Sequence, residues 1–204
     1  MPASLTRSAF SHFLARLSAV GLGLALLALA ARQGPAEQGV FSLLVATEAV
    51  YAALFSGFGL VVARQVSHHR EAAARWLGGA LVLALGAGGV GALVFWAAGG
   101  ALADAPAYRY LPALALAAPW LLLTPTVSGL YLGLGRMGPI NALTVAPPAV
   151  ALLAIGAWAL AGQPVTLWAV MMVWLGARML VGLAGAAWAW RDQRGRAPDW
   201  PAWR

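Results

Sequence analysis

The chain of 204 residues contains no cysteine, and its 13 Lys or Arg side chains are all arginine. Without cysteine the protein has no disulfide, no thiolate nucleophile and no cysteine-ligated metal site. Charged side chains make up only 9% of the residues, whereas soluble globular domains carry roughly 25%. The scarcity of charge therefore excludes an ordinary soluble domain.

Long apolar runs take the place of the missing charges, since 62% of the residues are hydrophobic. A bilayer core about 30 Å thick is crossed by roughly 20 apolar residues in a helix, in which every backbone polar group is satisfied without water. About six such runs predict an all-α, polytopic integral membrane bundle over residues 1–190, with a basic tail at 191–204. The runs are 13–31, 40–63, 76–98, 111–132, 140–161 and 166–190.

The first run has two interpretations. A basic start with Arg7 and Arg16, an apolar middle and the small residues Ala28, Ala30 and Ala31 are also typical of a cleavable signal peptide. We favour a retained helix, and cleavage stays open as the alternative.

The positions of the arginines predict the orientation of the bundle, because short cytoplasmic loops collect positive charge. With the amino terminus inside, only Arg32 and Arg109 lie outside. Both termini are therefore predicted to be cytoplasmic. The net charge of +7 does not indicate a nucleic-acid partner, because these arginines flank apolar segments. The arginines on the inner side are Arg7, Arg16, Arg64, Arg70, Arg75, Arg136, Arg191, Arg194, Arg196 and Arg204.

Two of the runs carry features that predict local packing. Ala80, Ala84, Gly88 and Ala92 recur every four residues and so form one stripe where a neighbouring helix can approach closely. The fourth run should bend, because proline removes a backbone donor and clashes with the preceding turn. Its prolines are Pro112, Pro119 and Pro125, and the hydroxyl side chains predicted to satisfy the freed carbonyls are Thr124, Thr126 and Ser128.

Glu48 and Arg178 are the two charges that no loop accommodates. A charge near the bilayer centre costs at least about 2.5 to 3.5 kcal/mol, so each needs compensation. At 1.5 Å per residue, Glu48 lies roughly 12 Å and Arg178 roughly 18 Å from the outer ends of their runs, which is close enough for contact. One interpretation is a buried ion pair that fixes how two helices dock. The other places both on an aqueous cavity.

Arg16 lies about one turn inside the first run. It either snorkels to the inner interface or faces the same cavity as Arg178. In the second case the two guanidinium groups form two stations for a phosphorylated lipid, because each presents a planar fork of donors to phosphate oxygens. The candidate cavity residues are therefore Arg16, Glu48 and Arg178.

Other polar and aromatic side chains have simpler interpretations. His68 and His69 point about 100° apart on a helix and cannot chelate one ion, so we expect a solvated pair. Tryptophan and tyrosine, with the terminal Trp200 and Trp203, are predicted to anchor the bundle at the headgroup level. Hydrolase and nucleotide-binding motifs are absent from the sequence, so we expect no enzyme, no cofactor and no metal.

Two stretches resemble a known family. The segment 31–46, continued through 58–64, is similar to the first loop and second helix of polysaccharide-biosynthesis flippases in the multidrug/oligosaccharidyl-lipid/polysaccharide exporter superfamily. The segment 129–141, Gly-Leu-Tyr-Leu-Gly-Leu-Gly-Arg-Met-Gly-Pro-Ile-Asn, resembles the passage between the fourth and fifth helices of that family. The resemblance covers only the amino-terminal lobe of a two-lobed family.

The resemblance implies translocation of a diphosphate-linked saccharide lipid across the bacterial inner membrane by alternating access. The family has a second lobe that this sequence does not contain. We therefore expect a chain that pairs with a copy of itself or with another protein, a truncated relic, or a member of a shorter divergent branch. Two alternatives stay open: a cation-coupled exporter of small molecules that uses Glu48, and a membrane scaffold or truncated half-transporter in which Glu48 and Arg178 only join helices. The expected partners are the lipid bilayer, an anionic lipid-linked saccharide and a second lobe.

Overall fold

The computed structural model describes residues 2–193, with side chains from Ser8 onward. Within these residues the chain forms helices and no strand, and six spans are long and apolar enough to cross a membrane. This confirms an all-α, multi-pass membrane protein. The predicted tail from residue 194, with Trp200, Trp203 and three arginines, lies outside the described residues. The spans are Ser8–Ala31, Pro35–His68, Arg70–Ala101, Pro106–Gly133, Met137–Leu160 and Leu167–Gln193.

The second and fourth spans are each divided into two α-helices, at Phe55 and at Leu122. The last helix continues to Gln193, three residues beyond the predicted run, and the first begins well before residue 13. In chain order the elements are α1 (Pro2–Ala31), α2 (Pro35–Leu54), α3 (Ser56–His68), η1 (Arg70–Ala72), α4 (Ala73–Ala101), η2 (Pro106–Tyr108), α5 (Leu111–Leu121), α6 (Leu123–Gly133), α7 (Met137–Leu160) and α8 (Leu167–Gln193).

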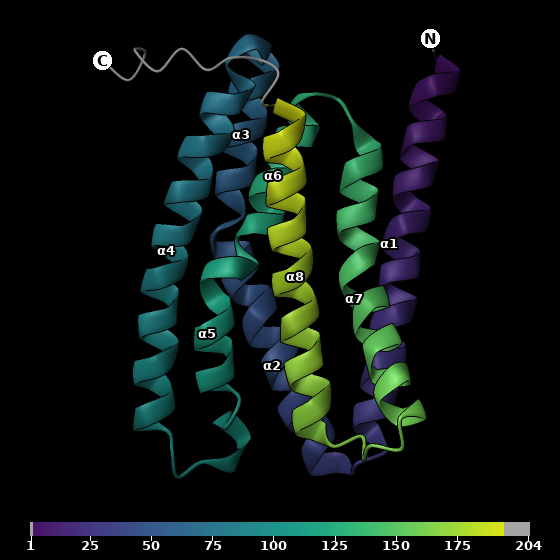
Figure 1. Ribbon diagram of the computed structural model, residues 1–204, viewed down its shortest axis with the longest axis vertical. Helices are drawn as coiled ribbons and strands as arrows, with labels where there is room; N and C mark the ends of the chain where they lie inside the picture. The colour runs from purple at the N-terminus through teal and green to yellow at the C-terminus, as the bar shows by residue number, and fades with distance from the viewer. Residues whose placement is uncertain (1, 194–204) are drawn as a thin grey trace.

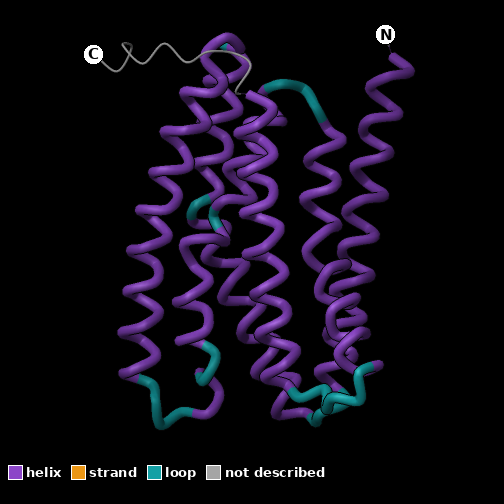
Figure 2. The backbone as a smooth tube through the Cα atoms, in the orientation of Figure 1, coloured by secondary structure: helices purple, strands orange, loops and turns teal. Residues whose placement is uncertain are grey.

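Figure 1 shows α4 and α5 side by side at one edge of the bundle, α1 and α7 at the other, and α8 between them. The start of α1 and the end of α8 lie at the same end, which we call the terminal end. The opposite, distal end contains the connections 32–34, 102–110 and 161–166 (Figure 2). The predicted orientation would place the terminal end in the cytoplasm.

The break at Leu122 lies between Pro119 and Pro125, as the prolines predict. Pro125 has no N–H to continue the helical ladder. The hydroxyl of Thr126 donates to the carbonyl of Leu122 at 2.8 Å, so Thr126 confirms the prediction for the hydroxyl groups around the bend. Thr124 instead lines a cavity, and Ser128 makes no side-chain hydrogen bond within the described residues.

Small residues let the helices approach closely. Ala84 and Gly88 of the predicted stripe are buried, and a Cβ at Gly88 would overlap the backbone of Pro119 on α5. The packing face of α4 is therefore confirmed. A second close approach joins α3 to α6, where a Cβ at Gly59 would lie 2.6 Å from the carbonyl oxygen of Pro125. A Cβ at Gly129 would overlap the backbone of Gly59.

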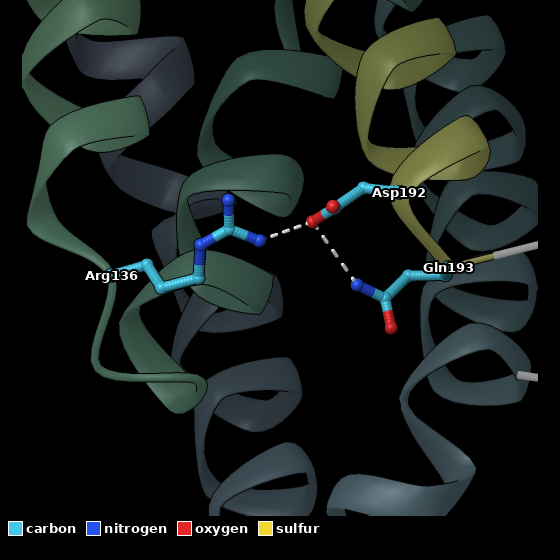
Figure 3. Close-up of polar contacts among 3 residues, drawn as sticks. All are labelled: Arg136, Asp192 and Gln193. Carbon is cyan, nitrogen blue, oxygen red and sulfur yellow. Dashed lines mark hydrogen bonds and ion pairs between the residues drawn. The ribbon is translucent and has the colours of Figure 1, made fainter. Parts of the chain in front are cut away.

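The loop between α6 and α7 is tied to the end of α8. Arg136 forms an ion pair with Asp192, and the side-chain amide of Gln193 donates to the same carboxylate at 3.5 Å (Figure 3). The guanidinium carbon of Arg136 also lies 5.3 Å from the ring centroid of Tyr131. Because this arginine is half exposed, the pair contributes about 1 kcal/mol at most. The main effect of the Arg136–Asp192 pair is therefore to position the end of α8.

We expect Gly129→Ala to destabilise the protein by about 1 to 3 kcal/mol, because the added methyl group would overlap the backbone of Gly59. The measurement is the thermal unfolding midpoint of the purified protein in detergent. Gly86→Ala is the matched control, since nothing lies within 4 Å of a Cβ there and alanine improves helix propensity at both positions. An equal midpoint for the two variants would contradict the close contact between α3 and α6.

Candidate functional site

Glu48 on α2 and Arg178 on α8 form an ion pair inside the bundle, through Arg178 Nε and Glu48 Oε1. The contact predicted from their depths is therefore present. Glu48 is only 2% exposed, so its carboxylate lies away from water. The indole N–H of Trp174 donates to the other carboxylate oxygen at 2.8 Å. Both oxygens of the buried carboxylate thus face a donor.

Trp174 and Arg178 act together because they are four residues apart on α8 and so share one face. The guanidinium carbon of Arg178 lies 5.2 Å from the ring centroid of Trp174, within cation–π range. Phe41 of α2 packs edge-on against the same indole, with the centroids 6.2 Å apart. A buried charge is tolerated only when it is paired and hydrogen-bonded, and these contacts meet that requirement.

Arg178 also faces a cavity of about 300 Å³ between α2, α5, α6, α7 and α8. Its side chain is 33% exposed, in contrast to that of Glu48. Thr124 and Thr144 contribute hydroxyl groups to the lining, and Pro125 and Pro147 contribute proline rings. The complete lining is Ala52, Leu121, Thr124, Pro125, Leu143, Thr144, Pro147 and Arg178.

The site offers hydrogen-bond donors and one guanidinium, and no nucleophile paired with a base. These groups suit binding of an anionic or polar group. Across the described residues there is no cluster of three or more metal-ligating side chains.

Arg16 does not join this site. Its side chain is exposed on α1, and its Nε donates to Nε2 of His12 at 3.2 Å. Nδ1 of His12 lies 2.8 Å from Oδ1 of Asn141 on α7. The two bonds together require the proton on Nδ1 and the lone pair on Nε2. Arg16 therefore belongs to a polar link between α1 and α7, and within the described residues it contacts neither Glu48 nor Arg178.

Sequence reasoning missed His12 and Trp174 as partners. Each lies four residues before an arginine, at the spacing that places two side chains on one helix face. This spacing was the available signal. Their partners on α7 and α2 are far away in sequence, and no local pattern indicates them.

The prediction that aromatic side chains anchor the bundle at the headgroups is wrong for several of them. Trp174 and Tyr51 are 8% and 4% exposed, and Tyr110 and Tyr131 are buried as well. Tyr51 donates to the carbonyl of Ala118 at 3.2 Å, and Thr47 shares a hydrogen bond of 2.8 Å with the hydroxyl of Tyr110. The hydroxyl groups of Tyr51 and Tyr110 thus find partners inside the protein and do not need the interface, whereas the buried hydroxyl of Tyr131 has no hydrogen-bond partner within the described residues.

The histidines at the end of α3 are exposed, as predicted for a solvated pair. Nδ1 of His69 lies 3.5 Å from a carboxylate oxygen of Glu71, and both side chains are mostly exposed. His68 and His69 thus lie at the surface of the terminal end.

No family model, curated protein or solved structure matches this chain. The resemblance to flippases therefore stays a prediction from the sequence.

We expect Glu48→Gln to destabilise the protein by about 3 to 5 kcal/mol, because it leaves the guanidinium of Arg178 without its counter-charge. Adding Arg178→Leu to Glu48→Gln should restore most of the loss, since the two effects are coupled through direct contact. The measurement is a double-mutant cycle of thermal unfolding in detergent. Glu71→Gln, at an exposed carboxylate, is the control and should leave the midpoint unchanged. A double variant no more stable than Glu48→Gln would show that the pair is not coupled.

Proposed function

We propose that the chain is one lobe of a membrane transporter that translocates an anionic, lipid-linked saccharide precursor. One observation carries this proposal. Arg178 lies within a membrane span, is held by Glu48 and Trp174, and lines a cavity of about 300 Å³. Burying an arginine at this depth costs free energy. An arginine that only joined two helices would not need a side chain partly exposed to a cavity.

The chemistry of the cavity fits a phosphorylated group. The ion pair with Glu48 runs through Nε of Arg178, so a ligand in the cavity would meet the edge formed by the two Nη groups. Guanidinium donors match two phosphate oxygens at once. Thr124 supplies a hydroxyl group that can donate to a sugar or phosphate oxygen. The hydroxyl of Thr144 donates to the carbonyl of Ile140 at 2.8 Å, so it can only accept, as from a sugar hydroxyl. The resemblance to lipid-linked oligosaccharide flippases supports the same class of substrate.

The proposal includes a second lobe and a location. Six spans correspond to one lobe of the family that the sequence resembles, so a second copy or another protein would complete the transporter. The distribution of the arginines favours a cytoplasmic terminal end, which supports a location in the bacterial inner membrane.

A membrane scaffold is the second candidate, and the burial of Glu48 favours it. A carboxylate that is 2% exposed, ion-paired with Arg178 and hydrogen-bonded to Trp174 can join α2 to α8 without any transport. The same burial weighs against the third candidate, a cation-coupled exporter, because the coupling carboxylate of such a protein must exchange protons with water.

The test compares lipid translocation by the purified protein and its variants in liposomes. The probe is a polyprenyl-diphosphate saccharide with a fluorescent label, whose inner and outer pools are distinguished by a membrane-impermeant quencher. The double variant Glu48→Gln with Arg178→Leu is the sharpest choice, because it should remain folded while it removes the cation. We expect a rate at least tenfold below that of the original protein. Arg178→Lys should retain part of the rate, since it keeps the charge and loses the fork.

Arg64→Gln, at an exposed arginine of α3, is the matched control and should translocate at the original rate. A transporter completed by a second copy of the chain is excluded if the original protein moves no more lipid than empty liposomes do. The proposal also fails if the folded double variant moves lipid at the original rate. That result would favour the second candidate, a membrane scaffold.

A further inference from the structure

A second pocket lies at the distal end of the bundle, and neither Glu48 nor Arg178 lines it. It has a volume of about 360 Å³ and a mixed polar and apolar lining. Three segments far apart in sequence build it: the turn into α2, the residue after η2, and the start of α8. The lining is Gln33, Glu37, Arg109, Thr166, Leu167, Trp168 and Met171.

Opposite charges face this pocket without neutralising each other. Glu37 is half-buried on the first turn of α2, and Arg109 is exposed after η2. Within the described residues neither side chain forms an ion pair or a side-chain hydrogen bond. The pocket therefore presents a separate anion and a separate cation to whatever enters it.

The residues that line the pocket lie at the ends of spans, where lipid headgroups are expected to meet the protein. Glu37 and Arg109 lie within the first turn of the second and fourth spans, and Trp168 is the second residue of the last. The ends of spans coincide with the headgroup region, where tryptophan is favoured. Trp168 is 52% exposed. Its place is fixed because the hydroxyl of Thr166 caps α8 by accepting from the N–H of Ala169 at 3.2 Å.

We propose that this pocket binds a phosphoethanolamine group, as found on a zwitterionic phospholipid of the bilayer. Arg109 binds the phosphate, because the guanidinium fork matches two phosphate oxygens. Glu37 accepts hydrogen bonds from the primary ammonium, and the exposed indole of Trp168 offers a face to the same cation. One ligand thus satisfies both unpaired charges.

The chemistry of the pocket discriminates among headgroups. A phosphoglycerol headgroup has a phosphate for Arg109 but no cation for Glu37, so its negative charge meets an uncompensated carboxylate. A phosphocholine headgroup has a cation without N–H donors, so it cannot donate hydrogen bonds to Glu37. The site is independent of the proposed transport, since it needs neither the central cavity nor a second lobe.

The test measures the binding of short-chain dioctanoyl lipids to the purified full chain in detergent micelles by microscale thermophoresis. We expect the phosphatidylethanolamine to bind at least tenfold more tightly than the phosphatidylcholine or the phosphatidylglycerol. Arg109→Gln should weaken binding of the phosphatidylethanolamine at least tenfold. Glu37→Gln should abolish the preference over phosphatidylglycerol without weakening the binding of phosphatidylglycerol, because only the contact to the ammonium is lost.

Arg32→Gln and Asp104→Asn are the matched controls. Both side chains are exposed at the distal end and neither lines the pocket, so both variants should bind like the original protein. Water-soluble glycerophosphoethanolamine identifies the source of the ligand: competition at similar concentrations indicates a free solute, and failure to compete indicates a bilayer lipid. The assignment is overturned if the three lipids bind equally, or if the control variants lose as much affinity as Arg109→Gln. Because no transport is measured, failure here leaves the proposed function untouched.

Discussion

The carboxyl group of Glu48, buried inside a lipid-immersed bundle, needs polar partners, and this requirement governs how α2 and α8 meet. Glu48 is almost fully buried, and the free energy of leaving it unpaired would exceed that of most single packing contacts. Arg178 and Trp174 supply its donors from one face of α8. The two helices can therefore slide or rotate against each other only by breaking these bonds.

Apolar contact alone would not fix such a position in a membrane, because lipid tails are as apolar as leucine side chains. Close packing of small residues supplies the remaining specificity. α4 meets α5 at Gly88, and α3 meets α6 where Gly59 faces Gly129. The structure thus combines two kinds of contact: tight backbone approaches on one side, and a few polar contacts along α1, α2, α7 and α8.

The sequence predicts the spans well, because their lengths follow from bilayer thickness and from the absence of charge. It also predicts the break near Leu122, since proline removes a hydrogen bond wherever it occurs in a helix. Depth along the helices was enough to place Glu48 opposite Arg178. Depth alone gave no information on rotation, however, so Arg16 could not be assigned to the Glu48–Arg178 site or to α7.

The break at Phe55 and the partners His12, Trp174 and Asn141 were not predictable for a related reason. The dipeptide Ser56–Gly57 permits a break without requiring one, whereas proline requires one. A hydrogen bond between helices depends on rotation about both axes, and a hydropathy pattern in a helix that is apolar on all sides does not encode that rotation. Only the four-residue spacing within each helix was visible in the sequence.

The same register connects the central site to the distal pocket. Glu37 and Glu48 are separated by 11 positions on α2, and Trp168 and Arg178 by 10 on α8, which corresponds to about 15 Å along either axis. Because both helices start at the distal end, they run parallel, and the register that pairs Glu48 with Arg178 also brings Glu37 and Trp168 to one pocket. A shift of one helical turn, about 5.4 Å, would separate both sets of side chains together. The buried ion pair thus sets the geometry of the distal pocket without touching it, although the chemistry of the two sites is separate.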